Sequence, residues 1–302
     1  MTTQITVVAG ATGRQGGAVA RALLTRGRKV RALVRDPSSA AARRLADAGA
    51  TVLRGDLDEP ASLAEPLTGA HAVFSIETAD YTNLMGDNEV RRARNLVNAS
   101  RRAGVVHVVH SSVSGTGNDD PGAFDATRWG AFPAHYWRSK IEAESIVRSG
   151  GFDAWTIVRP ATFMENLLPP SMWLAEFTSN RLAVVNDLDR IRPWVAVADI
   201  ATATLAALDD PHRFHGVELE LAGDLVSLRD AVAMLNEVRE PHIELPRDPD
   251  TALGWGIPPE LALSQERMDV YPAPARPEFA HELGIATTTF RAWTLNQAPA
   301  HH

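Results

Sequence analysis

The sequence of 302 residues contains no cysteine and no long apolar run. Without cysteine there can be no disulfide bond, thiolate metal site or thiol-based redox sensor. No apolar stretch approaches the roughly 20 residues that a membrane span requires, and the N-terminus enters a strand without the basic and apolar segments of a signal peptide. We therefore expect a cytoplasmic protein with no membrane partner.

Positive charge is also scarce. The chain has 30 Lys and Arg residues against 37 Asp and Glu residues, which gives a net charge of -7. This charge repels nucleic-acid phosphates and anionic lipid headgroups, and no local basic patch compensates for it. The expected partner is a small molecule rather than a nucleic acid, and the sequence leaves room for a homodimer.

Short β-branched runs alternate with segments of helical length over the first 160 residues. The predicted strands are residues 5–8, 30–34, 51–53, 72–76, 105–109 and 154–158, and the predicted helices are residues 14–26, 38–48, 60–67, 86–103 and 134–149. This alternation predicts an α/β fold with a doubly wound parallel sheet of the Rossmann type. Gly27, Gly49, Gly104 and Gly150 follow predicted helices, where left-handed C-cap geometry suits glycine.

The regular alternation ends after Arg159-Pro160, where prolines and tryptophans stand in irregular context. We predict a Rossmann domain over residues 1–160 and a smaller C-terminal substrate lobe over residues 161–302, with some segments returning to the Rossmann core. Within the lobe, Asp199 and Ser227 each precede an apolar-periodic stretch, and we expect both to be helix N-caps.

A glycine-rich loop joins the first predicted strand to the first predicted helix. It places glycines at positions 10, 13 and 16, with Thr12, Arg14 and Gln15 between them. In this context the glycines permit a tight turn and close approach of the backbone to a pyrophosphate, while N–H groups at the helix start hold the anion. The loop therefore predicts an NAD(P)-binding domain, and its G-x-x-G-x-x-G spacing is typical of short-chain dehydrogenases.

Arg35 stands at the end of the second strand, where NAD-specific proteins place an acidic residue on the ribose 2′-hydroxyl. A guanidinium here pairs instead with a 2′-phosphate, and Arg14 lies within reach of the same group. NADP(H) is therefore favoured over NAD(H). The alternative is that Arg35 is a solvated surface charge and Asp36 takes the ribose.

Further cofactor contacts are expected at the ends of the third and fourth strands, because ligands of such sheets bind outside the carboxyl ends of the strands. Asp56 and Leu57 close the third strand, where a carboxylate can accept from the adenine amino group or simply cap a helix. Ser75, followed by Ile76 and Glu77, is expected near the nicotinamide.

Tyr136 and Lys140 share one face of the predicted helix 134–149, one turn apart. Carbonyl reduction needs an acid, and a nearby ammonium lowers the pKa of a tyrosine from its usual value near 10. We assign Tyr136 as the acid. Lys140 lowers the pKa of Tyr136 and binds the cofactor ribose, and Ser112 donates the hydrogen bond that orients the carbonyl. Two alternatives stay open: Tyr136 has only a packing role, or His135 is the proton donor.

Taken together, these features resemble the short-chain dehydrogenase/reductase superfamily, and within it the atypical NmrA-like branch of NAD(P)-binding proteins. The matching blocks are residues 10–16 (GATGRQG), 30–37 (VRALVRDP), 110–114 (HSSVS), 139–140 (SK), 155–160 (WTIVRP) and 163–167 (FMENL). That branch includes quinone reductases, triphenylmethane reductases and NADP-sensing regulators. Many of its members carry another residue where Tyr136 stands, so the full Ser-Tyr-Lys set favours catalysis.

The substrate side is less defined. Phe163 and Asn166 belong to a bulky segment that either faces an apolar substrate or packs the two lobes together. Residues 115–133, which include Trp129, form a connection long enough to act as a lid. No metal site is expected, since His107 and His110 face opposite sides of a predicted strand.

The leading hypothesis is an NADPH-dependent reductase of an apolar ketone, quinone or enone, with hydride from nicotinamide and a proton from Tyr136. The rival is a non-catalytic NADP(H)-sensing regulator that binds a protein partner. A weaker alternative, an epimerase or dehydratase with tightly held NAD, is disfavoured by Arg35 and by the apolar lobe.

Overall fold

The computed structural model describes residues 4–80 and 82–297. The chain divides into two compact units. Unit 1 comprises residues 1–116, 136–159 and 197–219, and unit 2 comprises residues 117–135, 160–196 and 220–302. Residues 117–135, which the sequence assigned to the first domain, thus cluster with unit 2, while residues 197–219 return to unit 1.

A seven-stranded sheet forms the centre of unit 1. Its strands are β1 Ile5–Val8, β2 Lys29–Val34, β3 Thr51–Arg54, β4 Ala72–Ile76, β5 His107–Ser111, β6 Ala154–Pro160 and β9 Val217–Leu221. Their order is β3-β2-β1-β4-β5-β6-β9, and β1 to β6 pair in parallel. The chain turns back between β1 and β4, as in a doubly wound sheet, so the predicted Rossmann-type α/β fold is confirmed.

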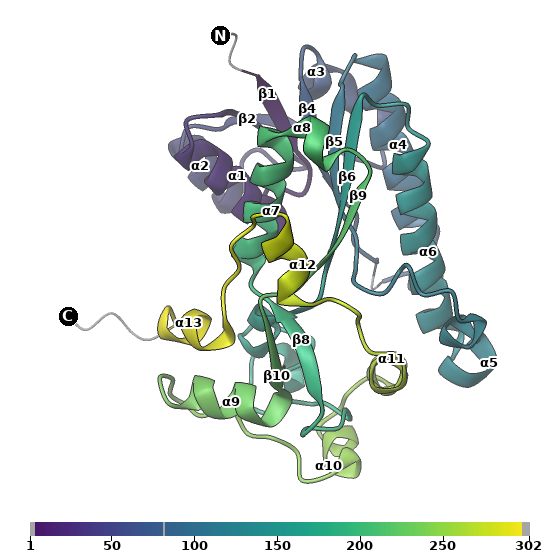
Figure 1. Cartoon of the computed structure of the whole chain (residues 1–302), viewed down its shortest axis with the longest axis vertical. Coiled ribbons are helices and arrows are strands. Elements are labelled where there is room, and N and C mark those ends of the chain that lie inside the picture. The colour runs from purple at the N-terminus through teal and green to yellow at the C-terminus, as the bar shows by residue number, and fades with distance from the viewer. Residues whose placement is uncertain (1–3, 81, 298–302) are drawn as a thin grey trace. The chain divides into compact units, whose positions relative to one another are not determined.

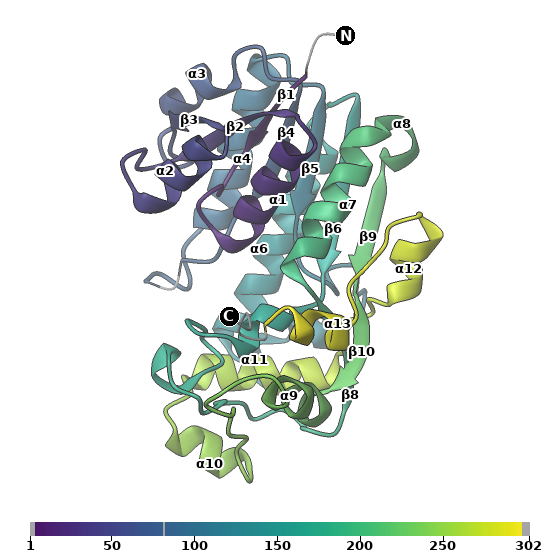
Figure 2. The same ribbon diagram turned by 90° about the vertical axis from the view of Figure 1, so that its left-hand side faces the viewer.

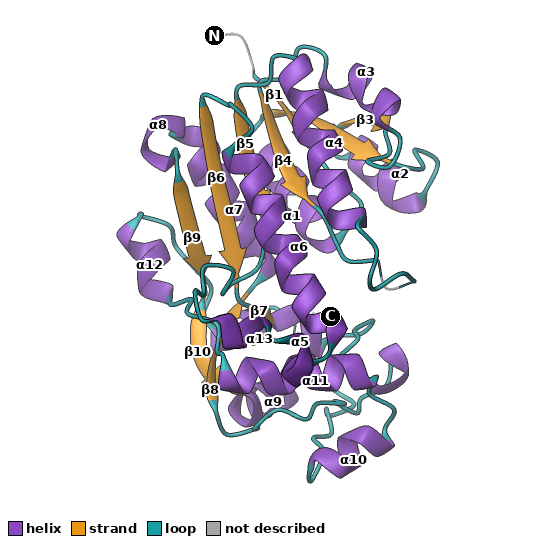
Figure 3. Ribbon diagram, turned by 90° about the vertical axis from the view of Figure 1, so that its right-hand side faces the viewer, coloured by secondary structure: helices purple, strands orange, loops and turns teal. Residues whose placement is uncertain are grey.

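Two differences from the sequence prediction are larger than the rest, since the other predicted strands of this sheet differ by at most two residues at one end. β5 begins two residues later than predicted, because the amide of Val105 bonds to the carbonyl of Ser100 at the end of the preceding helix. β9 was not predicted at all, and it lies at the sheet edge beside β6 (Figure 3).

Helices cover both faces of this sheet. They are α1 Arg14–Thr25, α2 Ala40–Asp47, α3 Ala64–Leu67, α4 Asn88–Arg102, α6 Ala131–Arg148, α7 Val197–Asp209 and α8 Pro211–Phe214, with a 3-10 turn η1 at Pro60–Leu63. α4 and α6 lie on one face (Figure 3), and α1 and α7 lie side by side on the other (Figure 2). Apolar side chains from strands and helices close the core between them, among them Val73, Val108, Leu96 and Val147.

The helix ends test the predicted caps. Gly27, Gly49 and Gly104 adopt the expected positive φ angles of 68°, 102° and 76°. Gly150 does not, and the left-handed residue after α6 is Gly151. The N-cap prediction is confirmed for Ser227, whose hydroxyl accepts from the amide of Asp230. It is wrong for Asp199, because α7 begins at Val197 and Asp199 lies in its first turn.

Unit 2 contains a small sheet (Figure 1), and tryptophans contribute to its core. Its sheet has the order β10-β8-β7, from β7 Thr162–Phe163, β8 Ile191–Val195 and β10 Asp224–Ser227. Its helices are α5 Ala126–Trp129, α9 Leu228–Asn236, α10 Pro249–Gly254, α11 Pro259–Val270, α12 Pro277–Glu282 and α13 Phe290–Leu295, with 3-10 turns η2 Pro121–Phe124, η3 Met164–Leu167 and η4 Ala175–Phe177. The rings of Trp173, Trp194, Phe290 and Trp293 follow one another at centroid distances of 6.1, 5.4 and 5.4 Å. Among the helices described in either unit, none is long and apolar enough to span a membrane.

Candidate cofactor and catalytic site

The glycine loop has the geometry that a pyrophosphate requires. Gly10 adopts φ +60°, and the amide of Gly13 donates to the carbonyl of Gly10 over 2.9 Å. α1 then begins at Arg14 with Gly13 as its N-cap, and no side chain fills that cap. A Cβ at Gly16 would lie 2.4 Å from the Gly10 oxygen, so α1 approaches the end of β1 more closely than any other residue permits. These features fit a bound dinucleotide, whose phosphates the exposed amides at the helix start would hold.

Gln15 links this loop to the end of β5. The hydroxyl of Ser111 donates to its side-chain oxygen over 2.6 Å. The start of α1 and the carboxyl end of β5 therefore share one end of the sheet, as the sequence predicted. Thr12 and Arg14 are exposed at this end.

The two residues after β2 are both exposed but differ in their contacts. The carboxylate of Asp36 accepts from the amide and the hydroxyl of Ser38 over 2.8 and 2.6 Å, and these bonds lower the pKa of Asp36. Arg35 makes no hydrogen bond or ion pair with any residue that the structure describes. The Asp36 carboxylate therefore stabilises the local turn, while Arg35 is available to a ligand.

Three other residues predicted to bind the cofactor, Asp56, Leu57 and Ser75, make hydrogen bonds to other residues of the chain. Asp56 accepts from the amide of Asp58 over 2.9 Å, which makes it a turn cap, and the carbonyl of Leu57 accepts from Asn95 over 2.7 Å. Ser75 is buried, and its hydroxyl donates to Glu77 over 3.0 Å and lies 3.2 Å from His110 Nδ1. The adenine contact of Asp56 and the cofactor contact of Ser75 stay predictions.

Tyr136 and Lys140 lie on one face of α6, as their spacing predicts. The Lys140 Nζ lies 5.6 Å from the centroid of the Tyr136 ring. The Lys140 side chain is buried, and its Nζ donates to the backbone carbonyl of Glu77 over 2.8 Å and lies 2.5 Å from Glu89 Oε1. Burial alone would lower the pKa of Lys140, but the negative charges of Glu89, Tyr136 and Glu77 together raise it. The raised pKa keeps the ammonium charged near pH 7.

Glu77 and His110 form a buried titratable pair behind Lys140. The Glu77 Oε2 lies 3.5 Å from His110 Nδ1 and accepts no hydrogen bond within the described residues. Burial raises the pKa of Glu77 to about 7, although the Ser75 hydroxyl opposes the shift. Burial, followed by the Lys140 charge, lowers the pKa of His110 to about 3. His110 is therefore neutral near pH 7, where Glu77 is half protonated.

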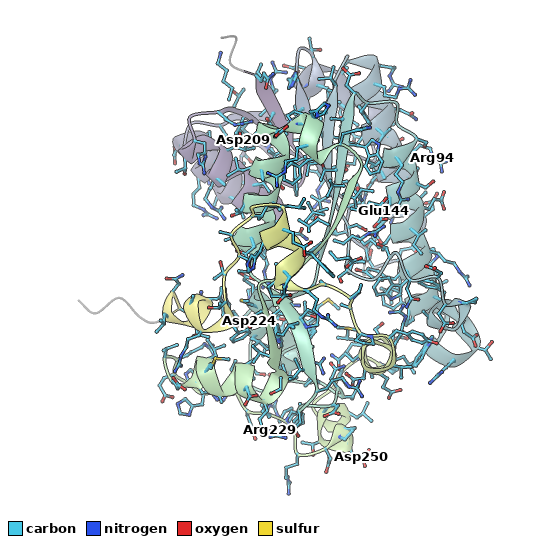
Figure 4. All side chains as sticks on the ribbon, viewed as in Figure 1. Arg94, Glu144, Asp209, Asp224, Arg229 and Asp250 are labelled. Atoms are coloured by element: carbon cyan, nitrogen blue, oxygen red, sulfur yellow. The ribbon has the colours of Figure 1, made fainter. Side chains whose placement is uncertain are left out.

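Ser112 is buried near Glu144, which Figure 4 labels. Burial opposes ionisation of Glu144, but hydrogen bonds from Arg159 and Thr116 lower its pKa below the usual value. Arg159 donates from Nε and Nη2 to the carboxylate over 3.0 and 2.7 Å. The Ser112 hydroxyl makes no hydrogen bond within the described structure, and its role as a carbonyl donor stays a prediction.

The predicted substrate residues lie in unit 2. Trp129 is buried there: its ring nitrogen donates to the carbonyl of Gly122 over 2.8 Å, and its ring meets Tyr271 edge-on at 6.1 Å. Residues 117–135 are thus ordered by their own unit and carry η2 and α5 rather than a bare loop. Phe163 and Asn166 are half-buried, whereas their neighbours Met164 and Leu167 belong to the core of unit 2. Substrate contacts of these residues stay predictions.

Sequence reasoning missed Glu89 and Glu144 altogether. Glu89 lies in the first turn of α4, where an acidic residue is the ordinary complement of the helix dipole. Glu144 lies one turn beyond Lys140 on α6 and resembles any helix-surface charge. No metal centre emerges among the described residues, where no three His, Asp or Glu side chains are grouped to hold an ion.

The fold and the glycine loop define an NAD(P)-binding Rossmann protein, and comparison with known proteins gives its family. The NmrA-like family model matches residues 1–262, so the chain belongs to the NmrA-like family. The NAD(P)H azoreductase of Xenophilus azovorans is 31% identical over 261 residues, which cover 85% of this chain and 83% of that protein. On this relationship the chain is an oxidoreductase.

Two solved structures share the fold. The Citrobacter sp. triphenylmethane reductase complexed with NADP(H) has a TM-score of 0.74 at 20% identity, and the match covers 98% of this chain and 100% of that one. NmrA, a negative transcriptional regulator in complex with NAD, has a TM-score of 0.72 at 21% identity, covering 97% and 95% of the two chains. An enzyme and a regulator therefore share this architecture, and the side chains must distinguish them.

Proposed function

We propose that this chain is an NADPH-dependent reductase of an apolar ketone, quinone or enone, and that Tyr136 gives the proton. The observation that carries the proposal is the pairing of Tyr136 with a buried, charged Lys140 on α6. Lys140 is bonded to the residue that follows β4, and β4 ends beside β5, whose last residue bonds to the first turn of α1. The acid, its cation and the glycine loop thus gather at the carboxyl ends of the strands.

The chain's own groups supply acid catalysis. When bound, the reduced nicotinamide supplies the hydride. The acceptor oxygen that gains the electron pair takes a proton from the hydroxyl of Tyr136, and the Lys140 ammonium stabilises the tyrosinate that remains. One hydride and one proton complete the two-electron reduction, and solvent restores the proton to Tyr136.

The preference for NADPH is part of the same proposal. Arg35 is exposed and unengaged at the end of β2, whereas the neighbouring Asp36 carboxylate is held by Ser38. A guanidinium in that position matches a 2′-phosphate, and a carboxylate committed to its own turn is poorly placed to bind a 2′-hydroxyl. Arg14 at the start of α1 is the second proposed contact.

The test is turnover of NADPH and NADH with a panel of quinones, enones, ketones and, because of the azoreductase relative, azo compounds. Tyr136→Phe keeps the ring that meets Trp137 edge-on at 5.8 Å, so the fold should survive. We expect turnover to fall by roughly 100-fold or more, the usual contribution of a general acid, with NADPH affinity unchanged. The matched control is Tyr271→Phe, which removes a hydroxyl from unit 2.

Each result decides between functions. Undiminished turnover in Tyr136→Phe would remove Tyr136 as the acid. If the wild-type chain bound NADPH but reduced no acceptor, the cofactor-sensing regulator would become the better explanation.

A further inference from the structure

The Lys140 ammonium is already committed to the protein. In unit 1 the ammonium donates a hydrogen bond to the Glu77 carbonyl over 2.8 Å and forms an ion pair with Glu89 Oε1 at 2.5 Å. An ammonium has three hydrogens, so it can also serve a ribose hydroxyl or Tyr136. The position of Lys140 is therefore set by the protein before any ligand binds.

Glu89 is the buried carboxylate in contact with the Lys140 ammonium. Its side chain is 7% exposed and that of Lys140 is 9% exposed, so water screens neither charge. Glu89 lies in the first turn of α4, where the helix dipole favours a negative charge. Removing one partner of such a buried pair leaves the other charge uncompensated.

The surrounding charges are few. Lys140 is faced by Glu89 from α4, by Glu77 after β4, by His110 from β5 and by Tyr136 from its own helix, and Arg92 of α4 acts on Glu77. Burial lowers the pKa of His110 to about 3 and raises that of Glu77 to about 7, and Glu89 is the carboxylate in direct contact with the ammonium.

We propose that Glu89 is a positioning residue for the reduction, which holds the Lys140 ammonium at the end of β4 and limits how strongly its charge acidifies Tyr136. This inference rests on the proposed function, since it takes Tyr136 as the acid. Glu89 touches neither substrate nor cofactor in this role. It acts through Lys140 alone.

The experiment is the pH profile of kcat in the wild-type chain, Glu89→Gln, Glu89→Asp and Tyr136→Phe. Reduction requires a protonated Tyr136, so the rate falls on the basic side as tyrosinate forms. In Glu89→Gln the amide oxygen still accepts from Lys140, but the cation is no longer neutralised. We expect the basic limb to move about 1 unit or more to lower pH, the effect of an opposite charge at this range.

A matched control is available on the same pair of helices. Glu142 on α6 pairs with Arg94 on α4 over 3.0 Å, and both side chains are exposed (Figure 4 labels Arg94). Glu142→Gln breaks a link between α4 and α6 without touching Lys140, and its profile should match that of the wild type. Glu89→Asp keeps the charge, so its basic limb should stay near the wild-type position even if kcat falls.

The outcomes separate the two claims. A Glu89→Gln profile that coincides with that of Glu142→Gln would overturn the role of Glu89, while loss of turnover in Tyr136→Phe would leave the proposed function intact. Undiminished turnover in Tyr136→Phe would instead overturn the proposed function. If Glu89→Gln does not fold by thermal melting, Glu89→Asp decides: a basic limb moved as far as 1 unit would contradict a role based on charge.

Discussion

In the proposed function, the choice between NADPH and NADH depends on two adjacent residues after β2. Their charges alone leave the choice open, because a guanidinium and a carboxylate both lie at the place where cofactor specificity is read. The hydrogen bonds from Ser38 support our proposal of NADPH, since they commit Asp36 to a local turn while Arg35 is exposed. A contact of this kind is local, yet charge and spacing in the sequence do not reveal it.

Arg35→Ala should therefore weaken NADPH binding and spare NADH. A hydrogen bond to a charged group is worth roughly 1.5 to 3 kcal/mol, which corresponds to at least a tenfold rise in Kd for NADPH. Fluorescence titration with both cofactors measures the effect. Arg26→Ala, at the opposite end of α1, serves as the control. Equal losses for NADPH and NADH would contradict the assignment of Arg35 to the 2′-phosphate.

The Tyr-x-x-x-Lys spacing likewise predicts only part of the site. It correctly predicts that Tyr136 and Lys140 share a helix face, because residues four apart are neighbours on any α-helix. It cannot predict the counter-charge of a buried lysine. Glu89 and the carbonyl of Glu77 come from positions more than 50 residues away along the chain, and only the folded sheet brings them to Lys140.

At the scale of elements, the junction of β1 with α1 is the least tolerant part of unit 1. A Cβ at Gly16 would lie 2.4 and 2.6 Å from the carbonyl oxygens of Gly10 and Ala9, which are backbone atoms that cannot turn aside. Gly27, at the other end of α1, has open space around it and requires only its φ of +68°. The two glycines therefore serve different purposes: Gly16 lies in the first turn of α1, and Gly27 follows its end.

Gly16→Ala should separate α1 from the end of β1. Overpacking of this kind costs roughly 1 to 3 kcal/mol of the free energy of unfolding, and here it also displaces the amides proposed to hold the pyrophosphate. We expect NADPH affinity to be lost together with stability, as measured by denaturant unfolding and cofactor titration. Gly27→Ala should lower stability by about 1 kcal/mol through backbone strain and leave affinity unchanged. Full NADPH affinity in Gly16→Ala would refute the proposed role of the loop.

Most elements of unit 1 could be predicted because their sequence pattern is local. The boundaries of β1 and β4 are those that the apolar runs indicate. The errors arise where distant contacts decide: the run at Val105 closes the end of α4 instead of opening β5, and β9 becomes a strand only because β6 offers it an edge. Residues 117–135 join unit 2 through contacts such as that of Arg267 with the Ala123 carbonyl at 2.5 Å, which no local pattern announces.

For the whole molecule, three buried groups of unit 1 contribute to the pH dependence of stability. Burial, assisted by the charges of His71 and His215, lowers the pKa of His107 to about 4, and that of His110 falls to about 3. The unfolded chain binds protons on both histidines near pH 6.5, so the stability that they contribute is complete above that pH and is lost as the pH falls. Glu77 acts in the opposite direction. Its pKa is about 7 in the folded state against 4.5 unfolded, so its contribution is complete below pH 4.5 and is lost as the pH rises through 7.

These opposing effects predict how single variants change the pH profile. On lowering the pH from 7 to 5, each histidine should lower the free energy of unfolding by about 2 kcal/mol, and Glu77 should raise it by about the same amount.

Glu77→Gln keeps an acceptor for the Ser75 hydroxyl but cannot titrate, so its free energy of unfolding should fall more than that of the wild type between pH 7 and pH 5. His107→Met should lose less, because neither ring nitrogen of His107 has a hydrogen bond within the described structure and an apolar side chain of similar size can replace it. Urea unfolding at both pH values measures the difference within each variant, so any change in stability common to both pH values cancels. If the free energy of unfolding changed by the same amount between pH 7 and pH 5 in Glu77→Gln, His107→Met and the wild type, Glu77 and His107 would titrate alike in the folded and unfolded chains, and the prediction would be wrong.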